Sequence, residues 1–312
     1  MTVPDPESVI RAPGPWTHRD VSANGARFHV ADLGSGPAVV LLHGFPTFWW
    51  TWRRQLTTLA DAGYRAIAMD LRGYGGSDHP PDGYDPRTMA ADVAGVIRSL
   101  GITEAVIVGH GWGAIAAWST AVLEPEVVRA IVPVSMPHPR RLRASILGNR
   151  HQRRAMNYAL GFQVPFLPER SLTSDDGARV VRLLAGWSAD ASWLDDDTST
   201  AYRAAFLRWP TAHTSVEYHR WAVRSVLRPD GLGYMSLMEA PVQCPVLQVH
   251  GAADPMILAA SVDGSEQFVR AAYARIDLDA GHYPHEERPD AFTRALLDWL
   301  DQLDQVASSD LA

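Results

Sequence analysis

The sequence predicts an α/β protein, in which a mostly parallel β-sheet is flanked by helices and carries an inserted helical cap. Short apolar, β-branched runs alternate with longer segments of helical periodicity, as in strand-helix-strand units. This alternation stops in residues 139–240, which are rich in Arg, Trp and Pro and contain no credible buried strand. We therefore expect one large α/β core, formed by residues 1–138 and 241–312, with residues 139–240 as its cap or lid.

Strands buried on both faces are expected where short apolar runs are continuous. These runs are Pro37–Leu42, Arg65–Met69, Ala105–Val108, Ala130–Val134, Pro245–Val249 and Tyr273–Leu278. Helical patterns between and after them cover Trp49–Ala62, Pro86–Leu100, Trp112–Leu123 and Pro289–Leu303. Right-handed crossovers between such strands bring their carboxyl ends to one edge of the sheet, where ligands of α/β proteins bind.

Charge and cysteine content narrow the functional classes. The 28 Lys and Arg against 35 Asp and Glu give a net charge of −7, and no basic run is dense enough for nucleic acid. Cys244 is the single cysteine, so no disulfide can form within the chain. The first residues lack a signal-peptide pattern, and no run reaches the roughly 18 apolar residues of a membrane span. We expect a cytoplasmic protein whose partner is a small apolar molecule, and we leave open a homodimer.

Residues with catalytic potential follow the predicted strands. His43-Gly44-Phe45-Pro46 forms a tight turn after the first long strand. Gly109-His110-Gly111-Trp112-Gly113 matches the spacing of a nucleophile elbow, a strained strand-to-helix turn between small residues. Asp254 and His282 follow the last two strands, which is the order of acid and base after the elbow in a hydrolase triad.

Together these motifs resemble the α/β-hydrolases of the epoxide hydrolase and haloalkane dehalogenase branch, over nearly the whole chain. The segment 70–78, Asp-Leu-Arg-Gly-Tyr-Gly-Gly-Ser-Asp, falls in the family's order with them. Phe45 after His-Gly favours the epoxide hydrolases, because dehalogenases prefer Asn there. The cap segments that begin at Tyr158 and Tyr218 resemble those that carry two epoxide-binding tyrosines.

The resemblance implies a role for each matching residue. His282 would be the base, oriented by Asp254, and Tyr158 and Tyr218 would protonate the epoxide oxygen. The backbone N–H groups of Phe45 and Trp112 would form an oxyanion hole. Neither a cofactor nor a metal is implied, and a zinc site is disfavoured because no HExxH spacing occurs.

Tryptophan is unusually frequent, and its positions indicate an aromatic binding site between cap and sheet. Of the 11 tryptophans, eight border or cover the expected crevice: Trp49, Trp50, Trp52, Trp112, Trp187, Trp193, Trp209 and Trp221. We expect substrate contacts from Phe48, Trp49, Trp50 and Phe162.

Gly111 departs from the family pattern, which has a nucleophilic Asp at the centre of the elbow. Glycine cannot attack, so one hypothesis is direct hydrolysis, in which His282 activates a water above Gly111. The alternative is a catalytically impaired protein that binds an apolar ligand in the remaining site. The sequence is compatible with an altered mechanism, lost catalysis or an engineered Asp→Gly exchange, whereas dehalogenation would also need the missing Asp.

Overall fold

The computed structural model describes residues 3–309 and contains one eight-stranded sheet in the order β1-β2-β4-β3-β5-β6-β7-β8. β1 and β2 form an antiparallel hairpin, β2 is antiparallel to β4, and the remaining neighbours are parallel. The strands are β1 Thr17–Ala23, β2 Ala26–Leu33, β3 Ala38–Leu42, β4 Arg65–Met69, β5 Ala105–His110, β6 Val128–Val134, β7 Val246–Gly251 and β8 Tyr273–Leu278. The predicted α/β class and the mostly parallel sheet are therefore confirmed.

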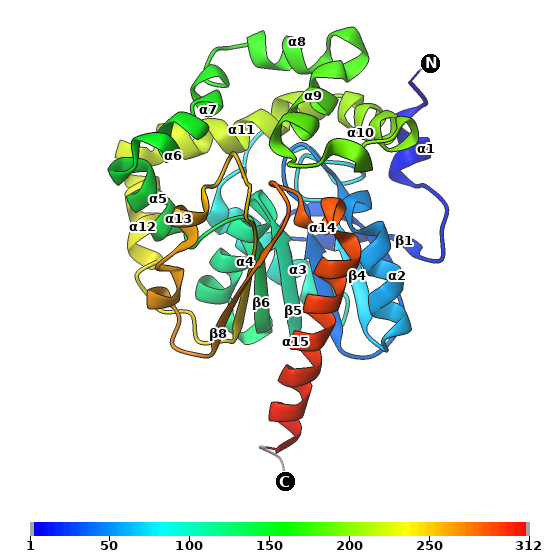
Figure 1. Ribbon diagram of the computed structural model, residues 1–312. Helices are drawn as coiled ribbons and strands as arrows, with labels where there is room; N and C mark the ends of the chain where they lie inside the picture. The colour runs from blue at the N-terminus through cyan, green and yellow to red at the C-terminus, as the bar shows by residue number, and fades with distance from the viewer. Residues whose placement is uncertain (1–2, 310–312) are drawn as a thin grey trace.

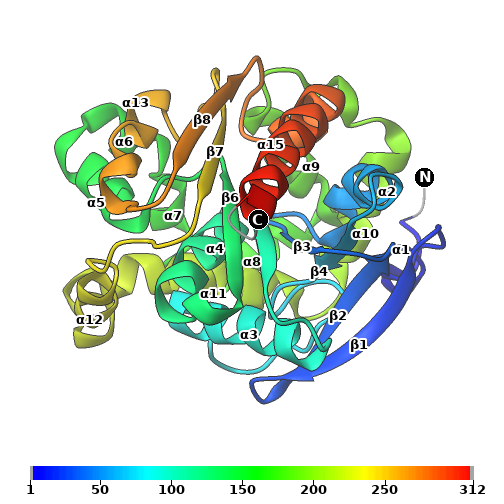
Figure 2. The same cartoon turned by 90° about the horizontal axis from the view of Figure 1, so that it is seen from below.

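Helices cover both faces of the sheet, because alternate residues of the central strands point to opposite sides. Val39 and Leu41 of β3 pack with α2 (Arg53–Asp61) and α15 (Pro289–Ser309). Val40 and Leu42 pack with α3 (Pro86–Ser99) and α4 (Trp112–Leu123) on the other face. Figure 2 shows the two helix pairs on either side of the strands.

Between β6 and β7 the described chain contains helices and no β-strand; most of these helices lie together above the carboxyl ends of the strands, whereas the last one lies at the side of the core (Figure 1). They are α5 Pro139–Gly148, α6 Arg150–Ala155, α7 Tyr158–Gly161, α8 Leu167–Thr173, α9 Ala178–Trp187, α10 Asp196–Leu207, α11 Thr211–Arg224 and α12 Pro229–Leu237, with single 3-10 turns between some of them. We call α5 to α12 the cap. The cap therefore covers the edge of the sheet where ligands bind in α/β proteins.

Three short helices lie outside these groups. α1 (Pro6–Ile10) precedes the β1–β2 hairpin, α13 (Ala259–Val262) follows β7, and α14 (Pro284–Glu287) follows β8. Among the described residues, no helix combines the length and the apolarity that a membrane crossing requires.

Candidate active site

The turn between β5 and α4 is built on glycines that are too closely packed to be replaced. A Cβ at Gly109 would lie 2.1 Å from the carbonyl oxygen of Gly113, and a Cβ at Gly113 would lie 2.3 Å from that of Leu42. Both distances are far shorter than a van der Waals contact. The strand and the helix can approach each other this closely only because these positions carry no side chain.

Gly111 lies at the tip of this turn and differs from its neighbours. Its backbone has φ 54° and ψ −113°, a region that side chains rarely adopt. We placed an ideal Cβ at this position and left aside its chain neighbours and the backbone of α4. Among the other described atoms, it lies within 4 Å of only two, the Cα of Gly44 at 3.6 Å and Nε2 of His282 at 3.9 Å. The tip of the turn therefore has room for a side chain that it does not carry.

His282 faces Gly111 from the loop after β8. Its Nδ1 lies 2.7 Å from Oδ2 of Asp254, the acid that follows β7. The second oxygen of Asp254 accepts the backbone N–H groups of Met256 and Ile257, at 2.7 and 3.0 Å. Because the carboxylate takes the hydrogen on Nδ1, Nε2 is left as the basic nitrogen on the side of Gly111.

The backbone of His282 is held from two sides. Its N–H donates to the carbonyl of Trp187 at the end of α9, at 2.8 Å. Its own carbonyl accepts a hydrogen bond from Nε2 of His110, also at 2.8 Å. Burial, together with the nearby rings of His285 and His282, holds the pKa of His110 well below its ordinary value, so His110 is a neutral donor here. The residue beside Gly111 thus positions the base.

Two backbone N–H groups adjoin the space above Gly111. Trp112 begins α4, and Phe45 follows Gly44 in a turn with a cis Phe45–Pro46 peptide bond. Within residues 3–309, neither N–H donates to another protein group. A helix N-terminus and a free N–H beside it form a site suited to an oxyanion.

Aromatic rings from the cap surround Phe45. The ring centroids of Phe162, Trp187 and His219 lie 5.7, 6.0 and 4.8 Å from that of Phe45. Tyr158 adjoins the same three cap residues, with centroid distances of 5.5, 5.1 and 5.5 Å. The lining above the turn is therefore mostly apolar and contains few groups that can donate a proton.

Tyr158 is one such group. Burial and the nearby charge of Asp254 raise the pKa of its hydroxyl, so the phenol stays protonated. In the described part of the chain, that hydroxyl has no hydrogen-bond partner. Tyr158 is therefore free to donate to a ligand.

His219 stands beside Tyr158 but in a different state. Burial lowers the pKa of His219 to about 4, and its ring is neutral near pH 7. Nδ1 lies 3.1 Å from the carbonyl of Ser215, and Nε2 lies 3.3 Å from Nε1 of Trp112. Since the indole N–H can only donate, Nε2 of His219 is an acceptor and Nδ1 carries the hydrogen.

Comparison with known families agrees with this geometry. A family model described as the alpha/beta hydrolase fold matches residues 37–289. The chain belongs to this family. Within the hydrolase family, epoxide hydrolase 3 of Xenopus tropicalis is 31% identical over 89% of this chain and 75% of its own length. Epoxide hydrolase A of Mycobacterium tuberculosis is 29% identical over 93% of this chain and 99% of its own length.

Solved structures of hydrolases give the same result. Epoxide hydrolase A from Mycobacterium thermoresistibile superposes with a TM-score of 0.79 at 30% identity, covering 92% of this chain and 98% of that chain. A mutant epoxide hydrolase from Bacillus megaterium in complex with its naphthyloxy-propanediol product has a TM-score of 0.81 at 26% identity, covering 91% and 100%. The predicted α/β-hydrolase fold and the epoxide hydrolase-like branch are thus confirmed.

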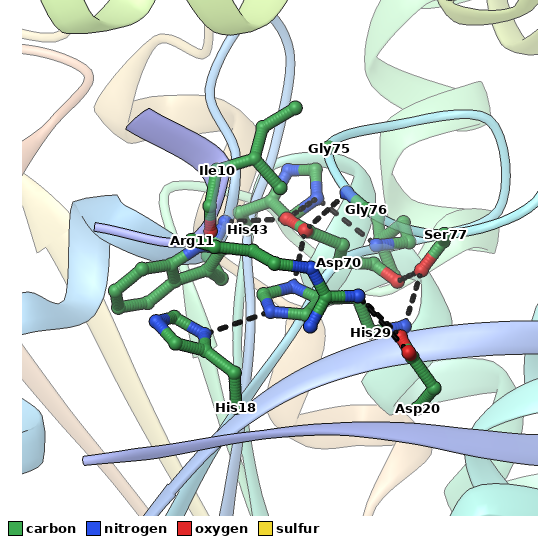
Figure 3. A network of polar contacts seen from close by, with 12 residues as sticks. Ile10, Arg11, His18, Asp20, His29, His43, Asp70, Gly75, Gly76 and Ser77 are labelled. Atoms are coloured by element: carbon green, nitrogen blue, oxygen red, sulfur yellow. Dashed lines mark hydrogen bonds and ion pairs between the residues drawn. The ribbon is translucent and has the colours of Figure 1, made fainter. Parts of the chain in front are cut away.

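The buried carboxylate of Asp70 holds the segment that follows the Phe45 turn, and Figure 3 shows this carboxylate beside His29 and Gly76. Asp70 accepts the backbone N–H groups of Trp49 and Gly76, both at 2.8 Å, and Nδ1 of His29 at 2.8 Å. Burial alone raises the pKa of Asp70, but the hydrogen bond and positive field of His29 outweigh it and the pKa is lowered. Asp70 therefore joins the start of the 70–78 segment to the chain just after the Phe45 turn.

The structure does not bring the Tyr218 hydroxyl to the candidate site. That hydroxyl donates to the carbonyl of Arg72 at 2.6 Å, and the ring packs against Tyr74 and Tyr84 in the core. His219, the next residue of α11, faces Phe45 instead. Successive residues of a helix point about 100° apart, and the sequence contains no signal that distinguishes these two positions.

The expected substrate contacts are also divided. Phe162 adjoins the site, whereas Trp49 does not: its Nε1 donates to the carbonyl of Ile10 at 2.7 Å, and its ring packs against Trp16 in the N-terminal segment. Phe48 and Trp50 pack on Tyr202 of α10, with centroid distances of 5.9 Å each. Both rings therefore lie between the core and the cap.

The donors of this candidate site are not arranged for a metal ion. Throughout residues 3–309, no group of three or more His, Cys, Asp or Glu side chains is placed to hold one. The chemistry that the site can supply is general base catalysis by His282, proton donation by Tyr158 and hydrogen bonding by two backbone N–H groups.

Proposed function

We propose that this protein adds water to an apolar epoxide or a similar small electrophile, by direct attack of a water that His282 activates. The observation that carries the proposal is the geometry of His282, whose Nδ1 lies 2.7 Å from Asp254 while Nε2 lies 3.9 Å from the ideal Cβ of Gly111. A water above Gly111 takes the place of the side chain that the related enzymes use. The naphthyloxy-propanediol product of the Bacillus megaterium enzyme supports an aryl glycidyl ether as a test substrate.

In the proposed step, one side chain accepts a proton and another donates one. Nε2 of His282 takes a proton from the water as the oxygen attacks an epoxide carbon, and the carbon–oxygen bond of the ring breaks. Tyr158 donates its phenolic proton to the departing oxygen, which gives the diol. Solvent then returns the proton from His282 to Tyr158. Neutral His219 cannot share the acid role in the tautomer described above, so Tyr158 acts alone.

Single turnover in oxygen-18 water tests this route. With enzyme in excess over an aryl glycidyl ether, direct attack puts the label into the diol in the first turnover and leaves the protein unlabelled. Label in a protein carboxylate would show an ester intermediate and overturn the direct route. His282→Gln should abolish diol formation, while His151→Gln, an exposed histidine on α6, serves as the matched control.

A second candidate function is binding without turnover, and Gly111 is the observation that favours it. If the wild-type protein forms no diol from any of a broad panel of epoxides, the hydrolytic proposal fails. Retention of the aryl glycidyl ether by the folded protein would then support a ligand-binding role.

A further inference from the structure

The space above Gly111 is bordered by hydrogen-bond donors. Trp112 is the first residue of the 12-residue helix α4, and its N–H has no acceptor within the described chain. The same holds for the N–H of Phe45, whose neighbour Gly44 lies 3.6 Å from the ideal Cβ of Gly111. Donors at the positive end of a helix attract a negatively charged group.

His282 is an independent second feature of this space. Its side chain is buried, with 6% of the residue exposed, and Nε2 has no partner among residues 3–309 although Nδ1 is bonded to Asp254. Nε2 points at Gly111, 3.9 Å from the position of a Cβ. A buried polar nitrogen that is aimed at an open position needs a ligand atom to complete its hydrogen bonding.

Because residue 111 is glycine, this position has no carboxylate that could accept hydrogen bonds from these donors. No carboxylate oxygen in the described chain lies within 4 Å of the ideal Cβ of Gly111. We propose that the space above Gly111 is a binding site for the carboxylate group of a monocarboxylate ligand, whose apolar body packs against Phe45, Phe162 and Trp187. One carboxylate oxygen accepts the backbone N–H groups, and the other shares a proton with Nε2 of His282.

The proposal predicts that ligand binding takes up a proton, which can be measured. A carboxylate anion cannot hydrogen-bond to an unprotonated Nε2, so binding takes up one proton, which lies between the ligand and His282. Asp254 is the acid that faces His282 and favours that added positive charge. The other titratable groups near His282 are His110, His250, His285 and Tyr283. Because binding takes up a proton, affinity should fall as the pH rises.

The inference goes beyond the proposed hydrolysis and does not depend on it. The binding measurement contains no epoxide, so it can succeed or fail whether or not the protein makes a diol. Phenylacetate is a suitable probe because it joins a carboxylate to an aromatic body. Phenylacetamide has the same shape without the charge.

Isothermal titration calorimetry of the wild-type chain tests the site. We expect phenylacetate to bind at least about tenfold more tightly than phenylacetamide, the ratio typical of a charge-assisted hydrogen bond. Titrations in two buffers of different ionisation enthalpy should reveal uptake of one proton. Equal affinity for acid and amide, or binding without proton uptake, would overturn the proposal.

Variants separate this site from binding elsewhere on the protein. Gly111→Asp places a carboxylate in the site and should weaken phenylacetate binding at least about tenfold by occupation and repulsion. Gly25→Asp is the matched control, because Gly25 also has a positive φ, 73°, and no atom within 4 Å of its ideal Cβ. If Gly111→Asp does not fold, His282→Gln provides the same test, since it should remove the proton uptake. Unchanged binding in both variants would contradict the assignment.

Discussion

Nδ1 of His18 and Nε2 of His29 lie 2.9 Å apart, in a chain of hydrogen bonds that ends on an acceptor at each side. Nδ1 of His29 contacts the carboxylate of Asp70 at 2.8 Å, and Nε2 of His18 contacts the carbonyl of Ala12 at 2.9 Å. These three hydrogen bonds need three protons on the two rings, so the pair carries one positive charge. Burial lowers the pKa of His18, and the carboxylate of Asp70 lies against the other ring of the pair.

Replacing Asp70 should therefore destabilise the fold strongly. Asp70→Asn removes the negative charge opposite the histidine pair and replaces one carboxylate oxygen by an amide N–H₂, which then faces either the N–H of Trp49 or the N–H of Gly76. Breaking a buried ion pair costs about 3–5 kcal/mol of unfolding free energy. Asp20→Asn, on the exposed pair with Arg11, is the control and should cost about 0–1 kcal/mol. Urea denaturation measures both, and equal losses would contradict the charged network.

The buried histidines should make the protein less stable in mild acid. The pKa of His219 is lowered by burial to about 4, whereas an unfolded histidine titrates near 6.5. The stabilising contribution of neutral His219 is therefore complete above about pH 6.5 and is lost as the pH falls toward about 4. From pH of about 7.5 to about 5, this histidine alone should account for about 2 kcal/mol of lost unfolding free energy.

His219→Gln isolates that contribution, because glutamine does not titrate in this range. Unfolding free energies from urea titrations at both pH values should fall less in the variant than in the wild type. Parallel losses in the two proteins would show that His219 does not drive the effect.

Restoring a carboxylate at the elbow should create the covalent route. The ideal Cβ of Gly111 makes only ordinary contacts, and we expect an aspartate there to cost a backbone strain of about 1–3 kcal/mol. In Gly111→Asp combined with His282→Gln, an aryl glycidyl ether should leave an ester on the protein, because the base that hydrolyses it is missing. Intact-protein mass spectrometry detects this adduct. Gly25→Asp with His282→Gln should remain unmodified, and an unmodified Gly111→Asp double variant would refute the prediction.

The two cap tyrosines should behave oppositely on mutation. Tyr158→Phe removes the proposed proton donor and should lower diol formation about 10²-fold or more without a large change in stability. Tyr218→Phe removes the hydrogen bond to the Arg72 carbonyl and should cost about 1 kcal/mol of unfolding free energy while leaving turnover intact. Diol assays and urea denaturation on both variants decide between the two residues, and loss of turnover in Tyr218→Phe would contradict our assignment.

The central sheet could be predicted because its strands are buried on both faces and their sequences are continuously apolar. The predicted helix Trp112–Leu123 has the same limits in the structure. The β1–β2 hairpin was not predicted, because its strands mix charged and apolar residues. His29 and Asp32 of β2 are buried, but their partners Asp70 and Arg65 lie far along the chain.

The candidate site shows a similar division. Four predicted site residues follow strands, so the topology of the sheet brings them to one edge: Phe45, Trp112, Asp254 and His282. Whether a cap residue reaches the site depends instead on which side of its helix faces the core. In α11, both Tyr218 and His219 are buried. A buried helix lacks the apolar stripe that would identify its inner face.

The open position at Gly111 also has an evolutionary consequence. Glycine codons that end in a pyrimidine become aspartate codons when the middle base alone changes from G to A. The base, its acid and the backbone donors are already in place around the tip of the turn. Where the codon of Gly111 ends in a pyrimidine, a single transition would therefore place an attacking carboxylate within a framework that already contains its acid, its base and its hydrogen-bond donors.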